Sequence, residues 1–314
     1  SDCKRTLIPV KEEAESELLS RYPVVHAEPL TPSPRTYRDH LNSFLSDREI
    51  ASIEWPNRHE FVGDLILIKL DSKQREYGEI IGQAMLMQHA RTRAVFEDRG
   101  VVGEYRVRDL NLLAVRDGFD STTRTQIIES GHHLWTDPST VYYSARLSRE
   151  REGTLESAKN LRDMLNRSIS VCDPYAGVGP SLAPLVNEPG LLSNLFASDL
   201  NQAAVELLRE NISASYAEIE CTDARTLHER NELCGKFDLL LVNIPHDTLE
   251  HLPHLLPLLN DGGTVRGWAV IEEEDLQSAR EVLANTLGKP VEIEVRRSYS
   301  ATANLCRFES KIHH

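Results

Sequence analysis

The sequence predicts an α/β fold built on a doubly wound, mostly parallel sheet whose last strand is antiparallel, preceded by a smaller N-terminal α+β domain. Three observations support this prediction. From residue 168 onward, apolar runs of strand length alternate with amphipathic runs of helix length. A glycine-rich turn follows the first of these strands, and the chain ends on two strand-like runs with no helix between them. Alternation implies parallel strands covered on both faces, whereas consecutive strands imply an antiparallel end.

The elements of the predicted sheet follow one another to the end of the chain. Turn residues bound each strand, and each helical run repeats apolar residues at helical spacing. A helix over 148–167, with Ser148 as a possible N-cap, leads into the first strand. The remaining expected elements are strands at 168–172, 195–199, 217–221, 237–242, 264–271, 291–297 and 303–310, and helices at 180–187, 201–213, 247–259 and 273–287.

The first half of the chain predicts different units. Residues 1–35 contain a possible helix and a three-proline segment, which indicates a lead-in or linker. Residues 36–147 predict a small α+β domain, and residues 148–312 the larger sheet domain. In a strand expected over 103–113, alternation places Tyr105 and Val107 on one face and Arg106 and Arg108 on the other. The other elements expected before residue 103 are helices at 10–21, 37–45 and 76–91 and a β-rich run at 61–70.

Composition limits the compartment and the partners. The formal net charge of −14 disfavours a general nucleic-acid coating. Of the 35 basic residues, 27 are arginine, whose planar guanidinium suits phosphates and base edges, so a local basic groove stays open. The five cysteines form no C-x-x-C pair and are expected to be buried, reduced thiols. No apolar run has membrane-spanning length and no signal-peptide pattern is visible, so a cytoplasmic protein is expected.

The most informative stretch is the turn after the first strand of the sheet. The strand ends at Asp173, and the chain then turns through Gly177 and Gly179. This spacing lacks the third glycine of the dinucleotide-binding motif, because Leu182 stands at that position. A carboxylate at the strand end repels pyrophosphate and suits a ligand with an amino-acid or ammonium end. The second strand ends at Asp199, 22 residues after Gly177, where an acid can bind ribose hydroxyls.

This pair of acids around a glycine turn resembles the S-adenosylmethionine site of class I methyltransferases. Their motif has the form Asp-x-x-x-Gly-x-Gly followed by an acidic second strand end. The resemblance implies a class I methyltransferase sheet that binds S-adenosylmethionine at its carboxyl edge. At the end of the third strand, Asp223 would contact the adenine amino group, although an acid after a strand is also a common helix cap. The alternative for the glycines is a turn that only packs helix on strand.

A second motif, Asn-Ile-Pro-His at 243–246, follows the fourth strand. It resembles the Asn-Pro-Pro-Tyr motif of methyltransferases that act on amino or ring nitrogens, with isoleucine in place of the first proline and histidine in place of the aromatic residue. The Asn offers a carbonyl acceptor and an amide donor to a base edge. A turn in which this Asn bonds its own backbone is the alternative. His246, His251 and His254 lack an acidic or cysteine partner at matching spacing, so no metal site is expected.

Five motifs in consistent order resemble a particular family, the archaeal and eukaryotic tRNA guanine N1-methyltransferases that modify guanosine 37, next to the anticodon. The resemblance covers residues 58–310. The motifs are Gly-Glu-Tyr-Arg-Val-Arg at 103–108, the run at 141–151 that ends in Arg-Leu-Ser-Arg-Glu-Arg, Asp-Pro-Tyr-Ala-Gly-Val-Gly-Pro at 173–180, Asp-Leu-Asn-Gln-Ala-Ala-Val at 199–205, and the 243–246 motif.

The resemblance implies methyl transfer to N1 of guanosine 37 in tRNA. Glu150 would be the general base that removes the N1 proton, and Arg106 would stabilise negative charge on O6. Asn243 would orient the guanine edge. The resulting prediction assigns Glu150, Arg106 and Asn243 to catalysis, and Tyr142, Arg146, Asp173, Tyr175, Ala176, Gly177, Gly179, Asp199, Leu200, Asp223, Ala224, Asn243 and Pro245 to cofactor binding.

Other interpretations remain open from sequence. The related aminocarboxypropyl transferase of the wybutosine pathway shares the fold and the cofactor. A non-catalytic RNA- or protein-binding member would keep the fold, with or without the cofactor as a stabilising ligand. Without the resemblance, Glu150 would be a surface salt-bridge partner of Arg146 or Arg151, and Arg106 part of a solvated strand face. The expected partner is the anticodon loop of tRNA, with a monomeric protein, no membrane and no metal.

Overall fold

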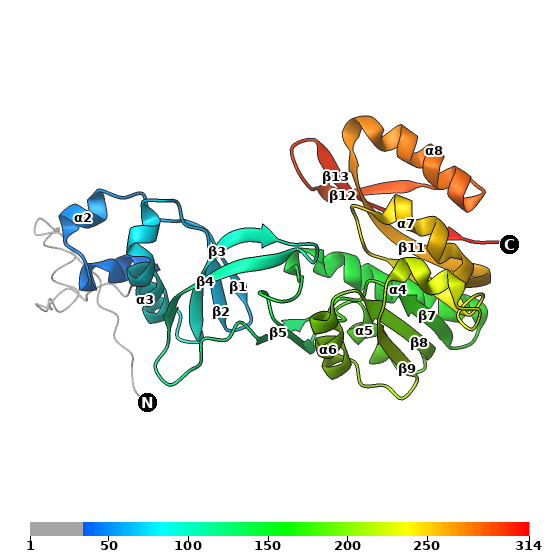
Figure 1. Cartoon of the computed structure of the whole chain (residues 1–314), viewed down its shortest axis with the longest axis horizontal. Coiled ribbons are helices and arrows are strands. Elements are labelled where there is room, and N and C mark those ends of the chain that lie inside the picture. Colours follow the sequence, from blue (N-terminus) through cyan, green and yellow to red (C-terminus); the bar gives the residue numbers. More distant parts are fainter. Residues whose placement is uncertain (1–33, 314) are drawn as a thin grey trace, which may run out of the picture.

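The computed structural model describes residues 34–313, and Figure 1 shows two lobes joined by a hairpin. The first lobe, residues 34–118, contains a four-stranded sheet, and the second lobe, residues 148–313, contains a seven-stranded sheet flanked by helices. The helix predicted over 10–21 lies outside the described residues.

The seven-stranded sheet has the order β12-β13-β11-β10-β7-β8-β9. Neighbours from β9 to β11 pair in parallel, whereas β13 is antiparallel to both β11 and β12. The predicted doubly wound sheet with an antiparallel last strand is therefore confirmed. The strands are β7 (Ile169–Asp173), β8 (Leu192–Asp199), β9 (Ala217–Cys221), β10 (Phe237–Val242), β11 (Leu259–Glu272), β12 (Ile293–Ser298) and β13 (Ala303–Lys311).

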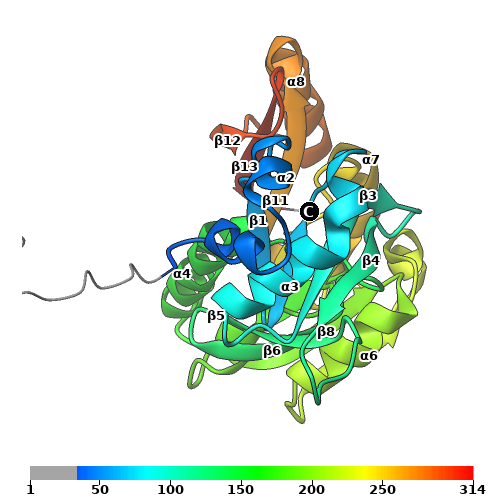
Figure 2. The ribbon, with the colours of Figure 1, turned by 90° about the vertical axis from the view of Figure 1, so that its left-hand side faces the viewer.

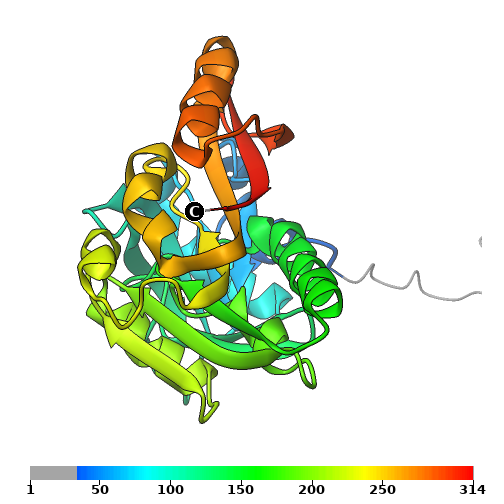
Figure 3. The same ribbon diagram turned by 90° about the vertical axis from the view of Figure 1, so that its right-hand side faces the viewer.

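Helices cover both faces of this sheet (Figure 3). Successive strand residues point to opposite faces, so Leu239 joins the apolar core under α4 and α5 while Leu240 joins the core under α7 and α8. These helices are α4 (Ser148–Leu165), α5 (Leu182–Val186), α6 (Gln202–Asn211), α7 (Thr248–Leu255) and α8 (Leu276–Leu287), with short 3-10 turns η3 (Ala145–Leu147), η4 (Ala224–Glu229), η5 (Leu256–Leu258) and η6 (Glu273–Asp275).

The sheet of the first lobe has the order β1-β2-β3-β4, and helix α3 packs on it (Figure 2). The β-rich run predicted over 61–70 lies in a hairpin of two strands, which reverses at Gly63, whose φ is +58°. The elements are η1 (Tyr37–Ser43), α2 (Asp47–Ala51), β1 (His59–Val62), β2 (Leu65–Ile68), η2 (Gln74–Tyr77), α3 (Gly78–Gln88), β3 (Ala94–Val102) and β4 (Val107–Val115).

The strand predicted over 103–113 is wrong at its start. Residues 103–106 form the turn between β3 and β4, in which the Arg106 amide donates to the Gly103 carbonyl at 3.2 Å and Arg106 has a φ of +52°. Strand alternation begins only at Val107, so Tyr105 and Arg106 do not occupy opposite strand faces. The prediction failed because β3, which it omitted, requires a tight reversal here to pair with β4.

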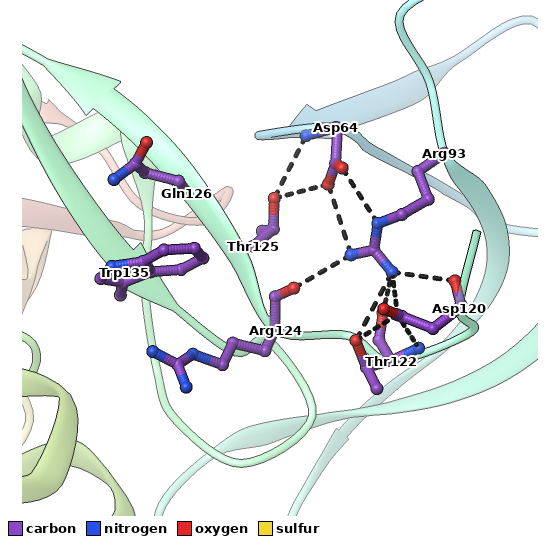
Figure 4. A pocket seen from close by; sticks show the side chains of 8 residues that line it. All are labelled: Asp64, Arg93, Asp120, Thr122, Arg124, Thr125, Gln126 and Trp135. Carbon is purple, nitrogen blue, oxygen red and sulfur yellow. Dashed lines mark hydrogen bonds and ion pairs between the residues drawn. The ribbon is translucent and has the colours of Figure 1, made fainter. Parts of the chain in front are cut away.

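A two-stranded hairpin of β5 (Thr125–Glu129) and β6 (His132–Thr136) joins the lobes. Beside it, the buried Arg93 donates to the carboxylates of Asp64 and Asp120 and to the carbonyl of Arg124 (Figure 4). Asp64 also accepts from the Thr125 hydroxyl at 2.7 Å. A cavity of about 390 Å³ adjoins this network. The hydrogen bonds of Arg93 are already made to protein acceptors, so we interpret this network as one that stabilises the connection between the first lobe and the hairpin rather than as a ligand site.

Two smaller predictions were wrong. Ser148 is the first residue of α4 rather than its N-cap, because η3 runs directly into the helix. Of the cysteines predicted to be buried, Cys172 and Cys306 are buried and Cys234 is half-buried, but Cys221 is exposed, since it ends the edge strand β9; Cys3 lies outside the described residues. Within residues 34–313, no helix is both long and apolar enough to cross a membrane.

Candidate active site

The glycine turn lies at the carboxyl edge of the sheet, between β7 and α5. Gly177 and Gly179 have φ values of +55° and +86°, which favour glycine. A Cβ atom on Gly177 would meet nothing within 4 Å, so this side of the turn is open to a ligand. A Cβ atom on Gly179 would lie 2.7 Å from Cδ1 of Leu208 in α6. Gly179 is therefore needed for close packing of α6 on the turn, which is the alternative role expected for these glycines. Gly177 instead leaves open space beside the turn that a ligand could occupy.

Asp173, at the end of β7, is a buried carboxylate that forms no ion pair with any residue in 34–313. Burial raises its pKa to about 7; the nearby charge of Asp199 adds to this rise, and a hydrogen bond from the Tyr175 amide at 3.2 Å opposes it. A buried carboxylate without a counter-charge is costly in its ionised form. It therefore favours a ligand that brings a cationic group.

Asp199, at the end of β8, is held by the backbone of two loops. Its oxygens accept from the amides of Gly177 and Asn201, both at 2.9 Å, while burial raises its pKa. Next to it, Leu200 is exposed. The two acidic strand ends thus flank the glycine turn, as the sequence predicted.

Asp223 shows the helix-cap arrangement. Its carboxylate accepts from the Arg225 amide at 2.9 Å and pairs with the Arg225 guanidinium at 2.6 Å. Close by, Tyr175 and the buried Ala224 belong to one apolar cluster, and the Tyr175 hydroxyl bonds Nδ1 of His251 at 2.7 Å. Any contact of Asp223 with a ligand has to share a carboxylate that Arg225 already binds.

Glu150 lies in the first turn of α4 and is buried. Its Oε1 atom accepts from Nε of Arg296 at 2.9 Å, its Oε2 atom accepts from Nε1 of Trp268 at 3.2 Å, and Nη1 of Arg307 lies 3.8 Å from Oε2. Burial raises the pKa of Glu150. The hydrogen bonds from Arg296 and Trp268 and the charges of Arg296 and Arg307 outweigh burial and hold that pKa below its usual value.

The surface pairing of Glu150 with Arg146 or Arg151 is therefore wrong. Arg151 turns the other way and forms a buried ion pair with Glu129, and Arg146 is exposed. The sequence could not show this, because the actual partners of Glu150 lie more than 100 residues away on the last strands.

Asn243 follows β10 at the same edge. The last residue of β10, Val242, pairs with Gly267, so Asn243 is level with Trp268 on the neighbouring strand β11. The Pro245 carbonyl accepts from the Val270 amide at 2.7 Å, which ties the 243–246 loop to β11. Because Trp268 bonds Glu150, this register brings Glu150 and Asn243 to one region of the sheet edge.

Arg106 reaches this region from the first lobe. Its Nη2 atom donates to the Tyr299 hydroxyl at 3.3 Å, and Nε2 of His246 lies 3.0 Å from the same hydroxyl. Burial and the charge of Arg106 lower the pKa of His246. Arg106 is exposed, as the alternative of a solvated face expected, but it sits in a turn rather than on a strand face, and its side chain reaches the Tyr299 hydroxyl beside the 243–246 loop.

Tyr142 and Arg146 line a groove of about 230 Å³ together with Arg106, Lys69 and Arg108. Carboxylates neutralise Arg108, but Lys69 and Arg146 form no ion pair within residues 34–313. Val141, which precedes Tyr142, also lines this groove and packs in one apolar cluster with Val178 of the glycine turn. The basic groove therefore adjoins the turn.

Sequence reasoning missed four residues of this site, Trp268, Arg296, Tyr299 and Arg307. A signal was present, since Arg296 and Arg307 occur in runs predicted as strands of a sheet covered on both faces. Charged side chains in such strands need partners. Among the described residues, no group of three or more His, Cys, Asp or Glu side chains could hold a metal ion.

The strand order, the open glycine turn and the acidic strand ends define the fold of class I methyltransferases. Within this class, the chain belongs to the TRM5/TYW2 methyltransferase family. A family model described as the TRM5/TYW2 methyltransferase domain matches residues 125–295, and one described as the TYW2 N-terminal domain matches residues 37–118.

Individual relatives agree with this assignment. The chain is 29% identical over 299 residues to tRNA (guanine(37)-N(1))-methyltransferase Trm5b of Pyrococcus abyssi, covering 93% of this chain and 82% of that protein. A crystal structure of Trm5b from Pyrococcus abyssi matches with a TM-score of 0.69 at 27% identity, over 94% of this chain and 87% of that one. A complex of aTrm5 with tRNALeu matches in fold, with a TM-score of 0.73 at 24% identity over 97% and 88% of the two chains. The chain covers a smaller share of the length of several other curated relatives, between 36% and 63%.

Proposed function

We propose that this protein transfers a methyl group from S-adenosylmethionine to N1 of guanosine 37 in tRNA. The observation that carries the proposal is the arrangement at one sheet edge. Trp268, level with Asn243, donates to the buried carboxylate Glu150, and the Tyr299 hydroxyl joins the 243–246 loop to Arg106, which also lines the basic groove. The names of the relatives support the same reaction, and one related structure is a complex with tRNALeu.

The residues present fit the proposed cofactor. The amino-acid end carries an ammonium group, which suits the uncompensated Asp173, and the open side of Gly177 permits close backbone approach. Asp199 is placed at the strand end that receives ribose hydroxyls in such sheets. Asp223 and Leu200 would border the base, and Tyr142 and Arg146 would close the side of the groove. When bound, S-adenosylmethionine supplies an activated methyl group on sulfur.

The protein's own groups then act on the base. Guanine N1 carries a proton at neutral pH, so it becomes a nucleophile only when that proton is removed. The lowered pKa keeps Glu150 ionised at neutral pH, and donors hold both of its oxygens. The low pKa also makes it a weak base, so its contribution would come from its fixed position beside the base edge. Arg106 would stabilise the negative charge that grows on O6, and the Asn243 amide would orient the base edge. Pro245 shapes the loop that presents Asn243.

The domain roles are part of the proposal. Residues 36–147 would contact the RNA, residues 148–312 would bind the cofactor, and residues 1–35 would be a lead-in. Lys69 and Arg146, which form no ion pair in the described part of the chain, and the exposed ring of Tyr142 offer phosphate contacts and a stacking surface. This local groove accounts for RNA binding by a chain with a net charge of −14. We expect the protein to act as a cytoplasmic monomer.

A second candidate reaction has one specific observation in its favour. Residues 37–118 match a model described as the TYW2 N-terminal domain, so transfer of the aminocarboxypropyl group from the same cofactor is the alternative. That reaction forms its bond to a different carbon of the cofactor. The buried base Glu150 beside the 243–246 loop favours methyl transfer.

The test uses the full chain and two forms of labelled cofactor. Transcripts with guanosine or adenosine at position 37 are incubated with S-adenosylmethionine labelled in the methyl group or in the carboxyl group. We expect methyl label in the guanosine transcript alone, with the mass increase of one methyl group at position 37. Carboxyl label in the RNA would establish the alternative, and absence of both labels would refute the proposal.

A further inference from the structure

Glu150 is one member of a charged cluster between α4 and the last three strands. The sheet face beneath the start of α4 carries Arg266 on β11, Arg296 and Glu294 on β12, and Arg307 and Glu309 on β13. Arg266 is 3% exposed and pairs with Glu309. On α4, Gly153 leaves room for this cluster, since a Cβ atom there would lie 3.0 Å from Nη2 of Arg266.

We propose that Arg296 and Trp268 are positioning residues for Glu150, and that Glu294 anchors Arg296 in turn. The inference rests on the proposed function, in which Glu150 removes the N1 proton. Each Glu150 oxygen accepts one N–H group, from Arg296 on one side and Trp268 on the other. Two donors on different oxygens hold the carboxylate plane in one orientation, while each oxygen keeps a further lone pair for the substrate proton.

Glu294 holds the arginines independently of Glu150. Its Oε2 atom accepts from Nη1 of Arg296 at 3.1 Å and from Nη2 of Arg307 at 2.5 Å. When Glu150 becomes protonated, both arginines therefore retain a carboxylate partner. The donors then stay in place through the proton transfer, and the site does not have to reorganise.

The charge balance of the cluster gives the positioning residues an electrostatic effect. Three arginines face three carboxylates, so the cluster is neutral while Glu150 is ionised. During the reaction the N1–H bond breaks and an O–H bond forms on Glu150, as N1 takes the methyl group and the methyl–sulfur bond breaks. The cluster then has one excess positive charge, which stabilises negative charge on the adjacent base and favours later release of the proton.

The decisive variant is Arg296→Gln, compared with Arg280→Gln, an exposed arginine on α8, as the matched control. The kcat/KM for a guanosine-37 transcript is measured against pH. We expect the acidic limb of the profile to move to higher pH by about one unit in Arg296→Gln, because Glu150 loses a cationic partner. The kcat value at pH 8 should fall on the order of tenfold, with unchanged cofactor affinity. Arg296→Lys should restore the acidic limb more fully than the kcat value.

A second variant separates positioning from folding. Trp268→Phe keeps an aromatic ring at this buried position but removes the N–H group together with the pyrrole part of the indole. We expect a smaller loss of kcat than in Arg296→Gln, and normal binding of S-adenosylhomocysteine would show that the fold is retained. The inference is overturned if Arg296→Gln and Arg280→Gln give the same pH profile.

The test also distinguishes this inference from the proposed function. NMR titration of the Glu150 carboxyl carbon in the wild-type protein and in Arg296→Gln measures how Arg296 changes the pKa of Glu150, and it needs no turnover. A wild-type protein that methylates no transcript would refute the proposed function, whereas an unchanged Glu150 titration in Arg296→Gln would refute the positioning role.

Discussion

Two buried carboxylates at the same sheet edge have opposite electrostatic surroundings. Asp173 has no cationic partner in the described part of the chain, and burial raises its pKa to about 7. Burial also raises the pKa of Glu150, but hydrogen bonds from Arg296 and Trp268 and the nearby charges of Arg296 and Arg307 bring it below its usual value. The protein thus supplies positive charge next to the proposed base Glu150. For Asp173, the positive charge would have to come from the ligand.

The architecture explains this difference. Asp173 ends the central strand β7 and is followed by a backbone turn, so its carboxylate receives the Tyr175 amide and lies near the charge of another carboxylate, Asp199. Glu150 begins a helix that packs over the antiparallel end of the sheet, where β12 and β13 present long arginine side chains. Substitutions at the two carboxylates should therefore have different effects on turnover, affinity and stability.

The largest expected effect is on turnover in Glu150→Gln. Removing a general base costs about 10²- to 10⁴-fold in rate, so we expect kcat to fall within this range while cofactor affinity stays unchanged. The loss should lessen at higher pH, because guanine N1 then ionises without help. Single-turnover methylation between pH 6.5 and 9 measures this, and a rate equal to that of wild type would remove Glu150 from the mechanism.

The next effect is on affinity in Asp173→Asn. Loss of a charge-assisted contact to the cofactor's ammonium group is worth about 1.5–3 kcal/mol, so the Kd for S-adenosylhomocysteine should rise on the order of 10- to 100-fold. Calorimetry of the wild-type protein, Asp173→Asn and the control Asp163→Asn, on the exposed side of α4, measures the change. Equal affinity in all three proteins would show that Asp173 does not meet the ligand.

The two carboxylates should also give opposite pH dependences of stability. The pKa of Asp173 rises from 3.8 to about 7 on folding, so its contribution to the free energy of unfolding is greatest below pH 4 and is lost as pH rises to 7. Without ligand, Asp173→Asn should therefore gain stability relative to wild type between pH 5 and pH 8. Glu150, whose pKa is lowered, contributes above its ordinary pKa and loses that contribution as pH falls.

Urea unfolding of the unliganded wild-type and Asp173→Asn proteins at both pH values tests this expectation. A stability difference that does not change between pH 5 and pH 8 would contradict the raised pKa of Asp173.

The smallest expected effect is that of Tyr299→Phe. The hydroxyl links Arg106 of the first lobe to His246, but both hydrogen bonds are exposed to solvent, which limits their contribution to about 1 kcal/mol or less. We expect kcat/KM for tRNA to fall about three- to fivefold, with cofactor affinity unchanged. Tyr105→Phe, at an exposed tyrosine in the neighbouring turn, is the control, and an equal effect in both variants would argue against a role for the Tyr299 hydroxyl.

The sequence predicted the second lobe more accurately than the first. In the second lobe most strands are apolar runs between turn residues, so the succession of strands and helices and the antiparallel last strand could be predicted. In the first lobe, strand β3 and the turn at 103–106 were missed. The turn places Arg106 at positive φ, which a sequence pattern does not reveal for a non-glycine residue.

What the sequence determined by itself is local. It determined where the strands of the second lobe run and where Asp173, Gly177 and Asp199 stand, because strand periodicity and turn chemistry involve neighbouring residues. The tertiary structure decided which charges meet. Trp268 and Arg296 lie 118 and 146 residues from Glu150 along the chain, and only the packing of α4 against the last strands of the sheet brings them together.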